Sequence, residues 1–157
     1  MEAILSVLQE LEIPFQLQEH PATFTVEQSS KIHIDLEGYK VKNLFVKDKK
    51  KNYLLITLGK DKRADLKAIA AQQGLGRLSF CDAQELADYL GITPGSVSPL
   101  CIMADRENKV TLLLDRDCKD RFILCHPLRN TATIRISYDD FLRFAGHFGH
   151  SVTLLDC

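Results

Sequence analysis

Two apolar segments joined by a lysine-rich turn constrain the fold of this chain most strongly. The segments "VKNLFVKD" and "NYLLITLG", residues 41–48 and 52–59, are rich in branched and aromatic residues and predict two β-strands. The turn between them, "KKK" at 49–51, is short enough only for an antiparallel hairpin. Any fold for this chain must therefore contain a sheet that includes this hairpin.

Periodic apolar residues predict helices and further strands along the rest of the chain. We expect helices at 1–11, 25–36, 64–74, 82–91 and 137–149, and strands at 15–20, 77–80, 100–105, 109–115, 122–128, 132–137 and 151–156. The expected N-caps are Thr25, Asp82 and Ser137, and the expected helix stops are Gly74 and Gly91. Because hairpins outnumber crossovers, the fold class is α/β (α+β), with a mixed, largely antiparallel sheet and packed helices.

Length and composition narrow the class of protein. A chain of 157 residues predicts one domain over residues 1–157. The net charge of −1 means that a polyanionic partner must be met by a local basic patch. No apolar run approaches a membrane span and no signal peptide is recognisable, so we expect a cytoplasmic protein without a membrane partner. The five cysteines include no C-x-x-C pair, which argues against a disulfide framework or a zinc site. We expect no metal and no cofactor.

Three segments concentrate polar and conformationally special residues. In "KVKNLFVKD", strand alternation turns either Lys42 or Asn43 toward the covered face of the sheet. The loop "LGITPGSVSPL" holds two prolines, two glycines and two serines in residues 90–100. In "CHPLRNTATIRIS", His126 ends a strand before a proline turn. Each segment also has a plain structural interpretation: an edge-strand lysine, a stiff connector and an ordinary turn. A Cys125–His126 nucleophile is disfavoured, because strand neighbours point to opposite faces.

In this order and register, the three segments resemble the YbaK/ProX family of aminoacyl-tRNA deacylases. The likeness covers nearly the whole chain, beginning with "EHPATFTVEQ" and ending with "CHPLRNTATIRISYDDFLRFAGHFGHS". It is strongest to the free-standing branch that hydrolyses alanyl-tRNA(Pro). The resemblance implies that Lys42 meets a phosphate or the developing oxyanion and that Asn43 orients the ester or amine. It also implies that Gly95 belongs to the site and that His126 contacts the substrate end or water.

The chemistry of editing explains why the loop would be rigid. A synthetase pocket built for proline cannot strongly exclude a smaller amino acid, so a second and smaller pocket must hydrolyse the wrong ester. Gly95, Ser96, Val97 and Ser98 are expected to form one wall of that pocket. The resemblance implies attack by water, assisted by the ribose hydroxyl of the substrate. Two alternatives stay open: a deacylase for cysteinyl- or seryl-tRNA, and a non-catalytic regulatory module that binds tRNA or an amino acid.

A basic strip follows the first strand of the hairpin. Seven basic residues lie between positions 47 and 63, against two acids: Lys47, Lys49, Lys50, Lys51, Lys60, Lys62 and Arg63. We expect Lys47, Lys49, Lys50 and Lys51 to contact the acceptor end of an aminoacylated tRNA. A solvated hairpin tip is the alternative interpretation. Prolyl-tRNA synthetase is a further candidate partner.

Overall fold

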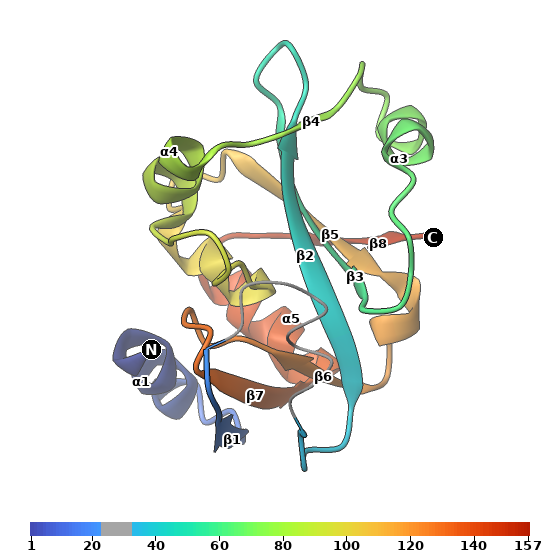
Figure 1. Ribbon diagram of the computed structural model, residues 1–157. Coiled ribbons are helices and arrows are strands. Elements are labelled where there is room, and N and C mark those ends of the chain that lie inside the picture. The colour runs from blue at the N-terminus through green and yellow to red at the C-terminus, as the bar shows by residue number, and fades with distance from the viewer. Residues whose placement is uncertain (23–32) are drawn as a thin grey trace.

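An eight-stranded sheet with helices packed around it forms the centre of the computed structural model (Figure 1). The structure describes residues 1–22 and 33–157. Within these ranges the strands are β1 (Gln16–Glu19), β2 (Tyr39–Lys47), β3 (Tyr53–Gly59), β4 (Ser79–Phe80), β5 (Val110–Asp115), β6 (Phe122–Cys125), β7 (Ala132–Ser137) and β8 (Val152–Leu155). The α-helices are α1 (Glu2–Glu10), α3 (Leu66–Gln72), α4 (Ala83–Glu85) and α5 (Tyr138–His147). Further helical turns span Leu86–Leu90, Pro99–Ala104 and Arg116–Cys118.

The sheet is mixed, as the sequence predicts. Its order is β1-β7-β6-β2-β3-β5-β8, and β4 also pairs with β2. The pairs β1–β7, β2–β3, β2–β4 and β6–β7 are antiparallel, whereas β2–β6, β3–β5 and β5–β8 are parallel. The predicted β2–β3 hairpin is confirmed, and its tip projects from one end of the molecule (Figure 1). None of the helices in the described part of the chain has the length and apolar character needed to cross a bilayer.

Alternation along β2 separates two apolar cores. Phe45 belongs to the larger core, and Val41 packs against it, together with side chains from α1 and α5. Val46 belongs to a smaller core with residues of α3, and Leu44 packs against that core. Because successive strand residues point to opposite faces, Asn43 shares the face of the larger core, whereas Lys42 lies on the face of α3.

The predicted N-caps Asp82 and Ser137 and the predicted helix stop Gly91 are confirmed, whereas the predicted cap Thr25 lies outside the described residues. Asp82 forms a capping box with Glu85, and the Ser137 hydroxyl accepts a hydrogen bond from the amide of Asp140. The helix after Asp82 ends at Gly91, whose φ is +64°. This positive φ suits glycine, because a side chain would strain the left-handed backbone.

Two element predictions need correction. The predicted strand at 100–105 is wrong, because Pro99–Ala104 forms a 3₁₀ helix that Ser98 caps and Pro99 opens. The predicted helix at 25–36 falls mostly on residues 23–32, which lie outside the described residues, and residues 33–36 are not helical.

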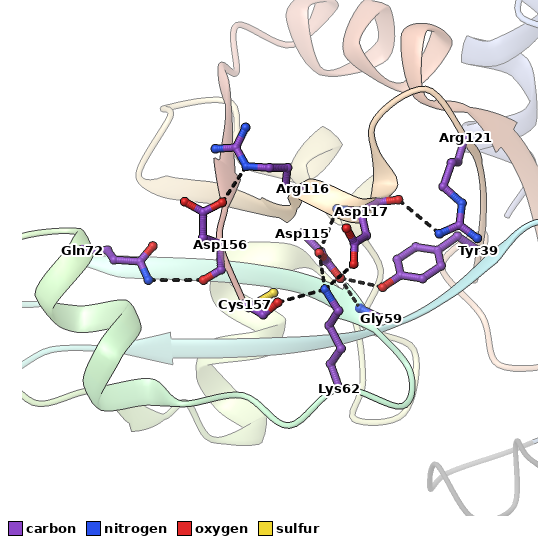
Figure 2. A network of polar contacts seen from close by, with 10 residues as sticks. All are labelled: Tyr39, Gly59, Lys62, Gln72, Asp115, Arg116, Asp117, Arg121, Asp156 and Cys157. Atoms are coloured by element: carbon purple, nitrogen blue, oxygen red, sulfur yellow. Dashed lines mark hydrogen bonds and ion pairs between the residues drawn. The ribbon is translucent and has the colours of Figure 1, made fainter.

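A buried carboxylate at the end of β5 joins the ends of β2 and β3 (Figure 2). Asp115 accepts hydrogen bonds from the Tyr39 hydroxyl at 2.8 Å, Gly59 N at 2.9 Å, Lys62 Nζ at 2.9 Å and Asp117 N at 3.0 Å. Burial alone would raise the pKa of Asp115, but these donors outweigh it and lower the pKa to about 2. The Tyr39 hydroxyl lies where a Cβ on Gly59 would sit, 2.1 Å away, so only glycine fits there.

The same network reaches the end of the chain. Lys62 Nζ also contacts Asp117 Oδ2 at 2.7 Å and donates to Cys157 O at 3.0 Å. Beside it, Asp156 joins α3 through Gln72 and pairs with Arg116 (Figure 2). The polar network therefore ties β2, β3, β5 and the segment after β8 into one unit.

Replacing Asp115 with Asn should lower the free energy of unfolding by about 3 kcal/mol, because the half-buried Lys62 and Tyr39 partners lose their buried anion. In urea titrations, the exposed Asp156→Asn control should cost less than about 1 kcal/mol. The Asp115 pKa is lower when folded, so its contribution is present above about pH 4 and is lost as the pH falls toward about 2. Equal stability of the two variants, or an acid transition unchanged in Asp115→Asn, would contradict this account.

Candidate active site

A small pocket opens where β2 pairs with β6, and Thr133 of the next strand, β7, also lines it; its cavity volume is about 50 Å³. Its lining residues come from distant parts of the sequence: Ile34, Lys40, Val41, Asn43, Lys60, Leu124, Cys125, His126 and Thr133. The pocket brings together two of the predicted catalytic residues, Asn43 and His126. They are 83 positions apart in sequence and meet because β2 pairs with β6.

Asn43 is held on both sides by the fold. The Thr57 hydroxyl, directly opposite on β3, donates to Asn43 Oδ1 at 2.6 Å. Asn43 Nδ2 donates to the carbonyl of Val97 at 3.2 Å. A side-chain amide has two N–H donors, so one remains for a ligand after the Val97 contact is made. Asn43 therefore links β2 to the proline–glycine loop and keeps a fixed orientation at the pocket.

The loop at residues 95–98 lies behind this contact. Gly95 has φ of +91°, which favours glycine, and the amide of Ser96 donates to Thr93 O at 3.2 Å. Ser98 is wholly buried, and its hydroxyl accepts from Leu100 N at 3.2 Å. None of Gly95, Ser96, Val97 and Ser98 is among the described residues that line the pocket. The loop acts on the pocket through Asn43, and the Ser98 hydroxyl is engaged in the helix cap.

Two histidines have tautomers fixed by carbonyl acceptors. His126 Nδ1 lies 2.9 Å from Ala132 O, and His20 Nδ1 lies 2.9 Å from Pro21 O. A carbonyl only accepts, so each Nδ1 carries the proton and each neutral ring keeps Nε2 as an acceptor. The Thr133 hydroxyl then donates to His20 Nε2 at 2.9 Å. No site role was predicted for His20 from the sequence, yet its ring centroid lies 6.2 Å from that of His126.

The electrostatics of the pocket wall favour neutral side chains. Burial lowers the pKa of His126, the nearby His20 lowers it further, and the Ala132 carbonyl opposes the shift. Burial raises the pKa of Cys125 to about 12, so its thiol stays protonated at neutral pH. This buried, protonated thiol agrees with the prediction that disfavours a Cys125–His126 nucleophile.

Lys42 does not line the pocket in the described part of the chain. It lies on the α3 face of β2, half-buried, opposite Leu58. β2 pairs with β6 only at Tyr39–Lys40 and with β4 only at Val46–Lys47. Lys42 therefore lies on the part of β2 between its pairing with β6 and its pairing with β4.

The predicted basic strip is divided in three dimensions. Lys47 pairs with Glu85, the two charged atoms 2.6 Å apart, and Lys62 pairs with Asp115. Lys49, Lys50 and Lys51 are exposed at the hairpin tip, whose turn is organised by hydrogen bonds to Asp48. Lys60 lies at the other end of β3, at the pocket. The strip divides because β3 separates residues 51 and 60 by its whole length.

Three polar residues of the pocket were not predicted as site residues from the sequence: Lys40, Lys60 and Thr133. His20 lies next to the pocket through its contact with Thr133. The basic strip did include Lys60, but nothing local connected it with Lys40 on the other side of the hairpin. Pairing the residues of the two strands one by one, starting at the "KKK" turn and moving away from it, would have placed Lys40 opposite Lys60.

The chain belongs to the aminoacyl-tRNA editing domain family, whose model matches residues 20–144. It is 33% identical to the prolyl-tRNA editing protein ProX of Acetoanaerobium sticklandii, over 99% of this chain and 96% of that protein. It is 34% identical to prolyl-tRNA synthetase associated domain-containing protein 1 of Danio rerio, over 94% of this chain and 82% of that protein.

A solved structure shares the fold. A crystal structure described as a trans-editing enzyme for prolyl-tRNA synthetase superposes with a TM-score of 0.71. The match covers 99% of this chain and 96% of that chain at 20% identity. The fold expected from the resemblance is therefore confirmed.

Replacing Thr57 with Val should lower the free energy of unfolding by about 1.5 kcal/mol, because Asn43 Oδ1 loses its donor inside the protein. The matched control is Thr111→Val on the exposed face of β5, which should change stability by less than about 0.5 kcal/mol. Urea unfolding measures both. An equal loss in the two variants would show that Thr57 does not hold Asn43.

Nitrogen-detected NMR should find His126 neutral at pH 7, protonated on Nδ1 and not on Nε2. Its titration midpoint should fall below the ordinary value of about 6.5, because burial disfavours the charged ring. Because the pKa of His126 is lower in the folded than in the unfolded chain, the stability that the neutral ring contributes is fully present above about pH 6.5. This contribution is lost as the pH falls further. The urea-unfolded chain is the reference. A proton on Nε2 at pH 7, or a midpoint above that of the unfolded chain, would contradict the assignment.

Proposed function

We propose that this protein, as one editing domain over residues 1–157, hydrolyses the ester of alanyl-tRNA mischarged on tRNA(Pro). The observation that carries the proposal is the small pocket in which Asn43 and His126 lie together. Membership of the editing family supports the reaction class, and the relative named prolyl-tRNA editing protein supports tRNA(Pro) as the carrier. The proposed partner is the acceptor end of that tRNA, and prolyl-tRNA synthetase is a further proposed partner.

The size of the pocket supports a small amino acid. A cavity of about 50 Å³ leaves little room beyond one small side chain. Each methylene that a pocket admits or rejects changes binding by about 1–3 kcal/mol, so a tight pocket can disfavour proline against alanine. The fixed Asn43–Val97 contact keeps the pocket from widening, because the loop is tied directly to β2.

The proposed chemistry relies on positioning. An aminoacyl ester is already activated, and the neighbouring ribose hydroxyl can assist an attacking water. The free N–H of Asn43 donates a hydrogen bond to the ester carbonyl of the substrate. The alternative role of Asn43 is to orient the α-amine of the substrate. His126 Nε2 accepts a proton or hydrogen bond from the water or the hydroxyl, as its neutral tautomer allows. The proposed role of Lys42 is to supply positive charge to a phosphate or to the developing oxyanion, and its side chain would have to reach the substrate from the α3 face of β2.

The protein should remove alanine from alanyl-tRNA(Pro) and leave prolyl-tRNA(Pro) intact. Cysteinyl- and seryl-tRNA(Pro) are tested alongside. His126→Ala should lower kcat/KM by about 10²-fold, since the proton acceptor is lost. The control, His147→Ala, removes an exposed histidine on α5 and should keep wild-type activity. The measurement is loss of labelled amino acid from tRNA over time.

Other results would replace this proposal. Loss of cysteine or serine, with alanine retained, would keep the reaction class and change the specificity. Binding of tRNA without any hydrolysis would favour a non-catalytic binding module. Equal activity of wild type and His126→Ala would remove His126 from the mechanism.

A further inference from the structure

Two lysines face each other across the hairpin at the rim of the pocket. The β2–β3 register pairs Val41 with Gly59, so Lys40 and Lys60 are the next opposed pair. The amide of Lys60 donates to Lys40 O at 2.9 Å, which extends the ladder by one step. Both residues line the pocket that also contains Asn43 and His126. Two lysines from adjacent strands therefore border one small site.

The charge of this pair is not balanced by the fold. Lys47, Lys62 and Lys109 each form an ion pair with a carboxylate. Neither Lys40 nor Lys60 has an ion pair with any residue in 1–22 or 33–157. Like charges directly opposite on two strands destabilise a sheet. An anion between the two side chains would remove that repulsion.

The environment of Lys60 points the same way. Its side chain is half-buried, and Lys40 is exposed. Burial lowers the pKa of Lys60, the charge of Lys40 lowers it further, and the adjacent Asp61 opposes the shift. The single carboxylate of Asp61 therefore leaves the repulsion between the lysines uncompensated. A bound anion would favour the charged form of both lysines.

The Asp115 network fixes the backbone that carries the pair. Tyr39 and Gly59 both donate to Asp115, and they immediately precede Lys40 and Lys60 (Figure 2). Because the residue before each lysine is tied to the buried Asp115, the backbone positions of both lysines are set before any ligand arrives. Such preorganisation lowers the entropic cost of binding.

We propose that Lys40 and Lys60 together bind a backbone phosphate of the RNA 3′ end whose terminal nucleoside enters the pocket. This inference rests on the proposed function and names the groups that hold the substrate. Two ammonium groups suit a phosphate, which offers several acceptor oxygens around one negative charge. The hairpin-tip lysines are too distant for this contact: Lys49 is six residues beyond Asn43, which is about 20 Å along a strand.

The test measures binding of an uncharged RNA trinucleotide, CCA, by fluorescence anisotropy. The double variant Lys40→Gln/Lys60→Gln should bind it about tenfold more weakly than wild type at low salt. The slope of log K against log salt should fall by about 0.7, because one phosphate of a single strand is no longer neutralised. Adenosine, which has no phosphate, should bind the two proteins equally.

A matched control separates this site from general charge. Lys67→Gln/Lys109→Gln removes the same charge from two exposed lysines outside the pocket and should bind the trinucleotide like wild type. The melting temperature of Lys40→Gln/Lys60→Gln should equal or exceed that of wild type, since a repulsion is removed.

The outcomes distinguish this inference from the proposed function. Equal trinucleotide binding by wild type and Lys40→Gln/Lys60→Gln, including no binding by either, overturns the phosphate site even if wild type hydrolyses alanyl-tRNA. An equal loss in Lys67→Gln/Lys109→Gln also overturns it. If the proposed function fails, wild type hydrolyses no aminoacyl-tRNA, yet the loss of trinucleotide binding in Lys40→Gln/Lys60→Gln still supports the site.

Discussion

The carboxylate of Asp115 is the polar group on which the geometry of the pocket depends. It is fully buried, and a buried carboxylate is costly unless donors surround it. Tyr39, Gly59, Lys62 and Asp117 supply those donors from three segments of the chain (Figure 2). Their combined effect outweighs burial and keeps the group ionised. The cost of removing one partner is therefore high, and the ends of β2 and β3 are held where the pocket begins.

The fold assigns its polar side chains to two tasks. Some are used up by the structure: Ser98 caps a helix, and Lys47 pairs with Glu85. Others keep free capacity at the pocket, such as the second N–H of Asn43 and Nε2 of His126. The distinction depends on partners and not on residue type. Two serines of one loop or two lysines of one hairpin can therefore have different roles.

The sequence predicted the hairpin, the helix caps and the helix stops well, because each depends on neighbours within a few residues. It failed at 100–105, where every residue of Pro99–Ile102 is buried. A short run that is apolar on all sides carries no periodicity, so strand and helix could not be separated there. The capping signal of Ser98 and Pro99 was present, but the apolar run outweighed it in the prediction.

The sequence by itself identified the three polar segments and two residues, Asn43 and His126, that the pocket brings together. It also left a choice between Lys42 and Asn43 for the covered face, since alternation gives a period but not a direction. Only the tertiary structure decided that Asn43 faces the larger core, that the basic strip divides, and that Lys40 and Lys60 lie at the same pocket as Asn43 and His126. These outcomes depend on which strands pair and in which register. Strand pairing is a contact between distant segments, which local sequence patterns do not encode.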